Sequence, residues 1–257
     1  MYKILYHKSI TGYGSIDGTY KCSQPIYFNP NKKHYLKLKY ASITNTIPNI
    51  CTGLSNNSLK VSNDNGATYT TITLSNGIYD INALNLAIKD VVSAWDTDVS
   101  DPTFQLLQNE YIQKVYCVID SSKLAVGTQF VIDFSLSDIS TLLGCITTKI
   151  FNTDGTFEFS HYPQVNYTGA RIFVNINNLV MNNNYFNGSP SRYICTIPKN
   201  STEQELVTPG TDNMTYDYVE LNMNSLSELE FSFIGSLNRS IYLLEGEVFV
   251  ELEIREL

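Results

Sequence analysis

The side chains that could carry catalytic chemistry are few, and they are scattered along the chain. None of the three histidines, His7, His34 and His161, stands at metal-ligand spacing from a cysteine or a carboxylate. A Ser-His-Asp triad is assembled in space, but the sequence contains neither a G-x-S-x-G nucleophile elbow nor an H-E-x-x-H zinc motif. Paired carboxylates could hydrolyse glycosides, but sequence alone does not pair them. We therefore predict a protein that is not an enzyme, with no catalytic residues, no cofactor and no metal.

Three aspartates, Asp96, Asp98 and Asp101, give the strongest hint of a cation site. A calcium loop of the EF-hand type needs a glycine at its sixth position and a glutamate at its twelfth. Counted from Asp96, those positions hold Asp101 and Leu107. The sequence therefore predicts an ordinary loop at the exit of a helix.

The cysteines are odd in number and widely spaced, without a C-x-x-C pair. They are Cys22, Cys51, Cys117, Cys145 and Cys195. This pattern argues against a disulfide framework and against a structural zinc site, so we expect reduced thiols. Cys145 follows Gly144, where a buried core thiol is a better interpretation than a nucleophile. The chain opens without a signal-peptide pattern and contains no run of about 18 apolar residues, so we expect no membrane span.

The formal net charge is −8, and only 16% of the residues are charged. Phosphate binding needs clustered Lys and Arg, so we expect no direct binding of nucleic acid. Lys37 and Lys39 alternate with leucines, as on the solvated face of a strand. The acidic counterpart comprises Glu245, Glu247, Glu251, Glu253 and Glu256. These glutamates are either solvated or face the basic residues of a neighbouring subunit.

The clearest structural signal is the alternation at the carboxyl terminus. Val248, Val250, Leu252 and Ile254 alternate with polar or aromatic residues, as does the stretch around Phe231. A period of two indicates strands with one buried face, so the last strand should pair deep in a sheet.

One helix is predicted, over residues 81–95, with Asp80 as its N-cap and an apolar stripe along one face. We expect it to lie across a sheet edge or to cap one end of the fold, and a partner-docking helix is the alternative. Asn65-Gly66 between two alternating runs predicts a hairpin over residues 59–74.

The whole pattern comprises eight or more short strands, one long helix and no internal repeat. Such a density of strands and turns is typical of an antiparallel sandwich or barrel, of which the jelly roll is a common large example. We predict an all-β, single jelly-roll antiparallel β-sandwich with one accessory helix and elaborated loops. Residues 1–20 are interpreted as an N-terminal arm, and residues 21–257 as one domain with loop insertions.

Three segments, in order, resemble the penton (minor capsid) proteins of virophages and Polinton-like (Maverick, adinto-like) DNA viruses. Residues 77–85, Gly-Ile-Tyr-Asp-Ile-Asn-Ala-Leu-Asn, resemble a G-x-Y-x-I-x-x-L-N entry into a helix. Residues 132–134 and 140–144 resemble an I-D-F … L-L-G-F segment, in which Cys145 replaces the family's aromatic residue. The alternating strands from Leu229 to Arg255 resemble the family's C-terminus.

The resemblance implies a penton protein that forms homopentamers at the fivefold vertices of an icosahedral capsid. Its partners would be copies of itself and trimers of a double jelly-roll major capsid protein. Its location would be the virion, after synthesis in the host cytoplasm or a viral factory. The alternative is a jelly-roll binding module, either a trimeric spike or a lectin-like receptor-binding protein. A jelly-roll enzyme of the cupin kind would need clustered His ligands, which this sequence does not offer.

Overall fold

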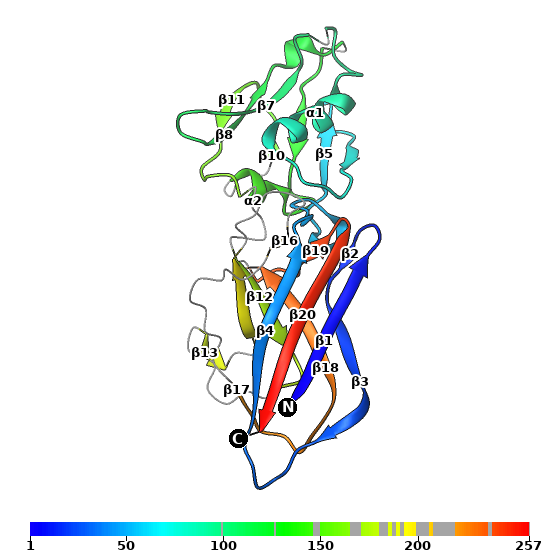
Figure 1. Ribbon diagram of the computed structural model, residues 1–257. Helices are drawn as coiled ribbons and strands as arrows, with labels where there is room; N and C mark the ends of the chain where they lie inside the picture. The colour runs from blue at the N-terminus through cyan, green and yellow to red at the C-terminus, as the bar shows by residue number, and fades with distance from the viewer. Residues whose placement is uncertain are drawn as a thin grey trace. The chain divides into compact units, whose positions relative to one another are not determined.

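Figure 1 shows the computed structural model of the chain. It describes residues 1–98, 100–125, 127–145, 150–164, 171–179, 185–186, 189–190, 193–198, 206–207, 219–235 and 238–256. The chain divides into two compact units. Unit 1 comprises Met1–Ile47 and Thr168–Leu257, and unit 2 comprises Pro48–Tyr167.

Unit 1 is built from two antiparallel sheets. The first has the order β1-β20-β4, with β16 and β17 both pairing with β4. Its strands are β1 (Tyr2–Ile10), β4 (His34–Thr44), β16 (Leu206–Val207), β17 (Val219–Leu221) and β20 (Gly246–Glu256). The second sheet has the order β15-β12-β18-β3. Its strands are β3 (Gly18–Tyr27), β12 (Arg171–Ile176), β15 (Tyr193–Pro198) and β18 (Ser225–Gly235).

The order of these pairings identifies the topology. When β16 and β17 are taken together as one position, these two sheets contain eight described strand positions along the chain. The first pairs with the eighth, the second with the seventh, the third with the sixth and the fourth with the fifth. This wrapping of one long antiparallel ribbon into two four-stranded sheets is a jelly roll. The predicted fold class is therefore confirmed by the pairing of the chain itself.

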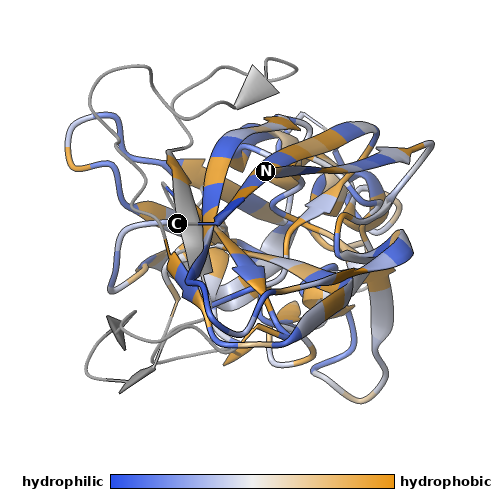
Figure 2. Ribbon diagram, turned by 60° about the horizontal axis from the view of Figure 1, so that its bottom comes forward, coloured by the Kyte–Doolittle hydropathy of each residue, from blue (hydrophilic) through white to orange (hydrophobic). Residues whose placement is uncertain are grey.

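The core of unit 1 follows from the alternation of the strands, which Figure 2 shows as changes of hydropathy along the ribbons. Val248, Val250, Leu252 and Ile254 of β20 are at most 1% exposed, as the sequence predicted. Burial of four such side chains contributes roughly 6–12 kcal/mol in gross terms, at about 1.5–3 kcal/mol each. Tyr6 of β1 stacks on Phe231 of β18, with 4.5 Å between the ring centroids, and so joins the two sheets.

The N-terminal arm expected over residues 1–20 is different in the structure. Tyr2–Ile10 is a strand that pairs with β20 along its whole length, from Tyr2 opposite Ile254 to Ile10 opposite Gly246. Its sequence signal is weak because Ile4 and Tyr6 are buried while Leu5 between them is 51% exposed. Three consecutive apolar residues conceal the period of two, and only the distant partner strand makes it visible.

Unit 2 lies in the chain between β4 and β12, so one connection of the jelly roll is a second compact body. This differs from the single domain expected over residues 21–257. Its strands are β5 (Ser58–Ser62), β6 (Thr70–Thr73), β7 (Phe104–Gln108), β8 (Val115–Ile119), β9 (Val131–Asp133), β10 (Ile150–Phe151) and β11 (Gly155–Glu158). They form two sheets, with the orders β10-β9-β5-β6 and β11-β8-β7. Buried aromatic side chains give unit 2 a core of its own, with Phe104, Phe130 and Phe134 fully buried.

The predicted helix is α1 (Ile81–Val92), and the side chain of Asp80 caps it by accepting the Ala83 N–H at 2.7 Å. It ends three residues earlier than expected, and its buried stripe continues through Val92. It belongs to unit 2, where Asn85 Oδ1 accepts the Leu106 N–H of the edge strand β7 at 2.7 Å. The helix therefore lies at the edge of a small sheet, which is one of the two positions expected from the sequence.

The smaller local predictions agree with the structure. The hairpin of β5 and β6 is present, and Asn65 and Gly66 have φ of 63° and 81°, as a turn with left-handed residues requires. A second, short helix is α2 (Ile139–Leu143), which ends at Gly144 in the left-handed conformation. Two small two-stranded sheets also occur among the described residues, β2 (Gly14–Ser15) with β19 (Tyr242–Leu243) and β13 (Tyr185–Phe186) with β14 (Ser189–Pro190).

Candidate functional site

The three histidines do not form a common site. His7 lies opposite Phe249 and His34 opposite Glu256, which are roughly 23 Å apart along β20 at about 3.3 Å per residue. His161 belongs to unit 2, where its Nδ1 lies 2.9 Å from the hydroxyl of the adjacent Ser160. Within the ranges that the structure describes, no group of three or more His, Cys, Asp or Glu side chains could hold a metal ion.

The buried histidine, His34, has a structural environment at the end of β20. Its ring lies against Phe28, with 4.7 Å between the centroids, and its Nε2 is 3.5 Å from Glu256 Oε2. Glu256 also forms an ion pair with Lys32. These contacts hold the last residues of the sheet in place, so His34 acts as a packing and hydrogen-bonding residue of the core margin.

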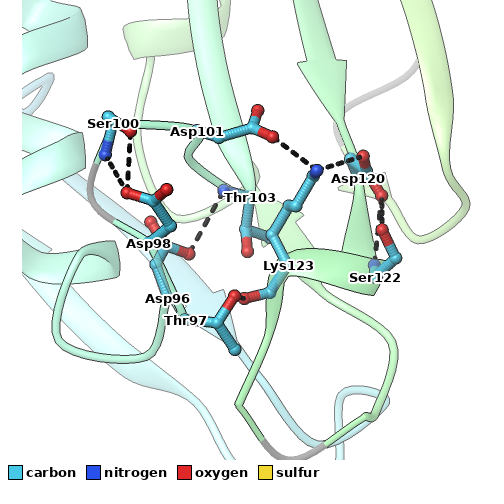
Figure 3. Close-up of polar contacts among 9 residues, drawn as sticks. All are labelled: Asp96, Thr97, Asp98, Ser100, Asp101, Thr103, Asp120, Ser122 and Lys123. Carbon is cyan, nitrogen blue, oxygen red and sulfur yellow. Dashed lines mark hydrogen bonds and ion pairs between the residues drawn. The ribbon is translucent and has the colours of Figure 1, made fainter.

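In the loop with three aspartates, the carboxylates of Asp96 and Asp98 accept hydrogen bonds from groups of the same loop (Figure 3). Asp98 Oδ1 accepts the N–H of Ser100 at 2.9 Å and its hydroxyl at 2.7 Å, which lowers the pKa of Asp98. Asp96 Oδ1 accepts the N–H of Thr103 at 3.2 Å. These contacts are those of an exit loop that stabilises its own backbone.

The positive charge that pairs with this loop belongs to a lysine side chain from elsewhere in unit 2. Lys123, in the short helix Ser121–Lys123, forms an ion pair with Asp101, and its Nζ lies 4.0 Å from Asp120 Oδ2 (Figure 3). The hydrogen bond to Asp101 is the main reason that the pKa of Lys123 is raised. Nothing near the aspartates in sequence indicated this partner, because it lies more than twenty residues further along the chain.

The cysteine side chains in the described part of the chain are thiols outside any disulfide, and most of them are buried. Cys51, Cys117 and Cys145 are buried, and Cys22 is half-buried. Burial raises the pKa of the Cys117 thiol to about 12, with a smaller contribution from the nearby Cys145. A thiol with such a pKa is a poor nucleophile near neutral pH, so the structure assigns Cys117 to packing. The side chain of Cys195 lies outside the described residues.

We expect all five cysteines to be reduced in the native protein. Alkylation in denaturant without reductant should add five labels to the intact mass, because an odd number of widely spaced thiols forms no disulfide framework. Under native conditions Cys22 should react before Cys51 and Cys117, which are fully buried. A mass with only one label would reveal two disulfides and would contradict this prediction.

The acidic row of β20 finds its partners within the chain. The ion pairs are Lys3 with Glu251 at 3.4 Å, His7 with Glu247 at 3.0 Å, Lys39 with Glu253 at 3.6 Å, and Arg255 with Glu253. Glu253 is only 3% exposed, which differs from the solvated position expected for it. The side chains of Lys39 and Arg255 cover it, and Arg255 lowers its pKa. A neighbouring subunit's basic residues are therefore not needed to neutralise this row.

Apolar side chains lie on the same outer face of the first sheet. Leu5 of β1 is 51% exposed and Tyr40 of β4 is 40% exposed, and both lie opposite Glu251 of β20. Phe249, two residues before Glu251, lies opposite His7 and Ser42. The ring of Phe249 is 5.9 Å from that of Tyr40 and 6.3 Å from that of His7. We call Leu5, His7, Tyr40 and Phe249 the outer patch. The patch therefore combines apolar side chains with the Lys3–Glu251 ion pair, which lies among them, and this mixture of apolar area and paired charge suits a protein–protein contact.

A cleft of about 470 Å³ in unit 2 lies beside Cys145, between β10 and β11. Phe151, Phe157 and Phe159 line it together with one carboxylate, Glu158, which forms an ion pair with Lys114 at 3.1 Å. A carboxylate held by a lysine among aromatic rings offers no acid–base pair, so this cleft has the character of incompletely filled core. No helix in the described part of the chain is long and apolar enough to cross a membrane.

Comparison with known proteins returned matches among solved structures. No family model matches the chain, and no curated protein matches it. The crystal structure of the selenomethionine-labelled mavirus penton protein aligns over 100% of both chains, with a TM-score of 0.46 and 10% identity. A chain of the Sputnik virophage, solved by cryo-EM, aligns over 98% of this chain and 97% of its own, with a TM-score of 0.39 and 13% identity. The jelly-roll assignment rests on the strand pairing of this chain itself.

Proposed function

We propose that this protein is a structural capsid protein, the penton protein that forms homopentamers at the fivefold vertices of an icosahedral virion. The observation that carries the proposal is a complete single jelly roll, in a chain whose three penton-like segments each fall on a defined element. Residues 77–85 lead into α1, residues 132–134 begin in β9, residues 140–144 overlap α2, and residues 229–255 run from within β18 to within β20. Segments that resemble a family in sequence thus occupy coherent places in the fold.

The two sheets of unit 1 give such a subunit the asymmetry that a ring requires. A ring closes through head-to-tail contacts, in which two different surfaces of the subunit meet. The outer patch lies on the β1-β20-β4 sheet, whereas the other sheet presents Glu230 and Ser232 of β18. Glu251 and Glu253 on this sheet pair with Lys3, Lys39 and Arg255 of the same chain, so a neighbouring copy need not supply charges to neutralise them.

The partners that follow from this proposal are further copies of the chain and a double jelly-roll major capsid protein around each vertex. The proposed location is the capsid vertex of the virion, with synthesis in the host cytoplasm or a viral factory. A role in the shell needs shape and contacts and no catalysis. The charged side chains of β20 support this role, because Glu251 and Glu253 form ion pairs within the chain.

Loss of the outer patch should abolish ring formation and leave the fold intact. We expect the double variant Leu5→Ser, Phe249→Ser to remain folded, because Leu5 is half-exposed and Phe249 is on the outer face of its strand. Its mass in native mass spectrometry should fall from that of five subunits to that of one, because interfaces depend on a few buried anchors.

The matched control is Leu86→Ser, on α1, where Leu86 is 60% exposed and lies in unit 2. This variant should keep the pentamer and the melting temperature of the wild type. Pentamers that persist in the double variant would place the self-contact on another face.

A further inference from the structure

The hairpin between β7 and β8 in unit 2 ends in a tip that is well organised and apolar at its apex. Tyr111 is 95% exposed and Ile112 is 43% exposed. Asn109 Oδ1 accepts the N–H of Tyr111 at 2.9 Å and that of Ile112 at 3.1 Å. Gln113, at φ 56°, donates its side-chain N–H to the Glu110 carbonyl at 2.6 Å. The chain therefore holds a large aromatic side chain in solvent on a tip whose backbone is fixed.

A cleft of about 360 Å³ adjoins this tip, a size within the range of small-molecule sites. The tip contributes Glu110 and Gln113, and the hairpin contributes Leu107 and Gln108. The opposite wall is the start of α1, and the complete lining is Asp80, Ile81, Asn82, Leu107, Gln108, Glu110 and Gln113.

Both walls of the cleft are rigid. On one wall the Asp80 cap fixes the first turn of α1, and Asn85 ties the helix to the Leu106 N–H of β7. On the other wall Gln108 Nε2 donates to the Gln113 carbonyl at 3.1 Å across the base of the tip. A site with preformed walls binds its ligand without the entropic cost of ordering them.

The chemistry of the lining selects the class of ligand. Asp80 and Glu110 are acids, Asn82, Gln108 and Gln113 are amides, and none of the seven lining residues is basic. Two carboxylates without a cation repel an anionic ligand, and a lining with this many polar groups disfavours a purely apolar one. Carboxylates and amides together accept and donate hydrogen bonds to several hydroxyl groups at once. The adjacent Tyr111, on a tip whose backbone is held by hydrogen bonds, adds a flat aromatic face with a polar hydroxyl.

We propose that this cleft and Tyr111 form a binding site for a neutral, hydroxyl-rich glycan. The polar lining hydrogen-bonds the hydroxyl groups of one sugar unit, and the Tyr111 ring packs against the apolar face of the same or the next unit. This activity goes beyond the capsid role proposed above, since it belongs to a site within unit 2 and needs no second copy of the chain.

The test uses the full-length protein and a printed array of neutral and sialylated glycans, followed by titration calorimetry with the soluble form of the neutral glycan that gives the strongest array signal. We expect binding to neutral glycans and none to their sialylated counterparts. Tyr111→Ala should weaken the affinity about tenfold, and Glu110→Gln should weaken it as well. Tyr111→Phe should retain most of the affinity, because it keeps the ring.

The matched control is Tyr27→Ala, which removes a tyrosine that is 76% exposed on β3 of unit 1. It should bind the glycan as the wild type does. Binding to no neutral glycan, binding to sialylated glycans alone, or an affinity that Tyr111→Ala leaves unchanged would overturn the proposal. Calorimetry with a soluble monovalent sugar reports each subunit separately, so its result stands whether or not the protein forms rings.

Discussion

Val250→Asp is expected to unfold the jelly-roll unit at room temperature or to bring it close to unfolding. Val250 is fully buried in β20, which lies between β1 and β4, opposite Tyr6 on one side and Ala41 on the other. A carboxylate at this position would lie in an apolar interior without an evident partner. We expect a loss of about 4 kcal/mol or more, against a total stability of about 5–15 kcal/mol for a typical domain.

Urea denaturation, monitored by circular dichroism, measures this loss in the free energy of unfolding. The control is Glu251→Gln, one residue further along, where the side chain points to the other face and pairs with Lys3. Its cost should be below about 1 kcal/mol, because pairs with one exposed partner contribute little. Equal midpoints for the two variants would show that the register of β20 is different from the one described.

Gly144→Ala is expected to have the second largest effect, in unit 2. Gly144 ends α2 with φ of 81°, in the left-handed region, which costs an L-residue about 1–2 kcal/mol. A Cβ atom at this position would lie 2.2 Å from the backbone oxygen of His161, which cannot move aside as a flexible side chain would. The segment is also bound here, since the His161 N–H donates to the Gly144 carbonyl at 3.0 Å. The total cost should exceed about 3 kcal/mol.

Gly127→Ala separates the cost of the left-handed backbone conformation from the cost of the clash with His161. Gly127 also has a positive φ, of 67°, but a Cβ atom there meets no atom within 4 Å. This variant should lose only about 1 kcal/mol, the cost of the backbone conformation alone. Differential scanning calorimetry of both variants gives the comparison, and equal losses would contradict the close approach between Gly144 and His161.

The elements that were predictable from the sequence are those whose signal is local. The alternation of β20, the Asp80 cap of α1 and the Asn65-Gly66 turn each depend on residues within a few positions of one another. Period and capping chemistry are sufficient for such elements, and their repetition along the chain was sufficient for the fold class.

The features that the sequence did not reveal depend on distant partners. Tyr2–Ile10 is recognisable as a strand through its pairing with β20, almost 250 residues away. Glu253 follows the rule of alternation, but Lys39 and Arg255 cover it. Unit 2 contains short strands such as Ile150–Phe151, and two residues are too few to show a period.

The candidate sites likewise include features with a local sequence signal and features that depend on distant residues. The absence of a triad motif was visible in the sequence, but the role of Lys123 at the aspartate loop was not, because that contact depends on the folding of unit 2. The cleft beside Tyr111 joins the start of α1 to a hairpin tip about 30 residues later. A signal was present in the tip itself, since Asn-Glu-Tyr-Ile-Gln places two apolar residues inside a polar turn.

Native mass spectrometry of the purified wild-type protein tests the central claim most directly. The account predicts closed rings with the mass of five 29.0 kDa subunits, and fivefold symmetry in class averages from electron microscopy. A threefold assembly would contradict it and would support the alternative of a trimeric jelly-roll spike.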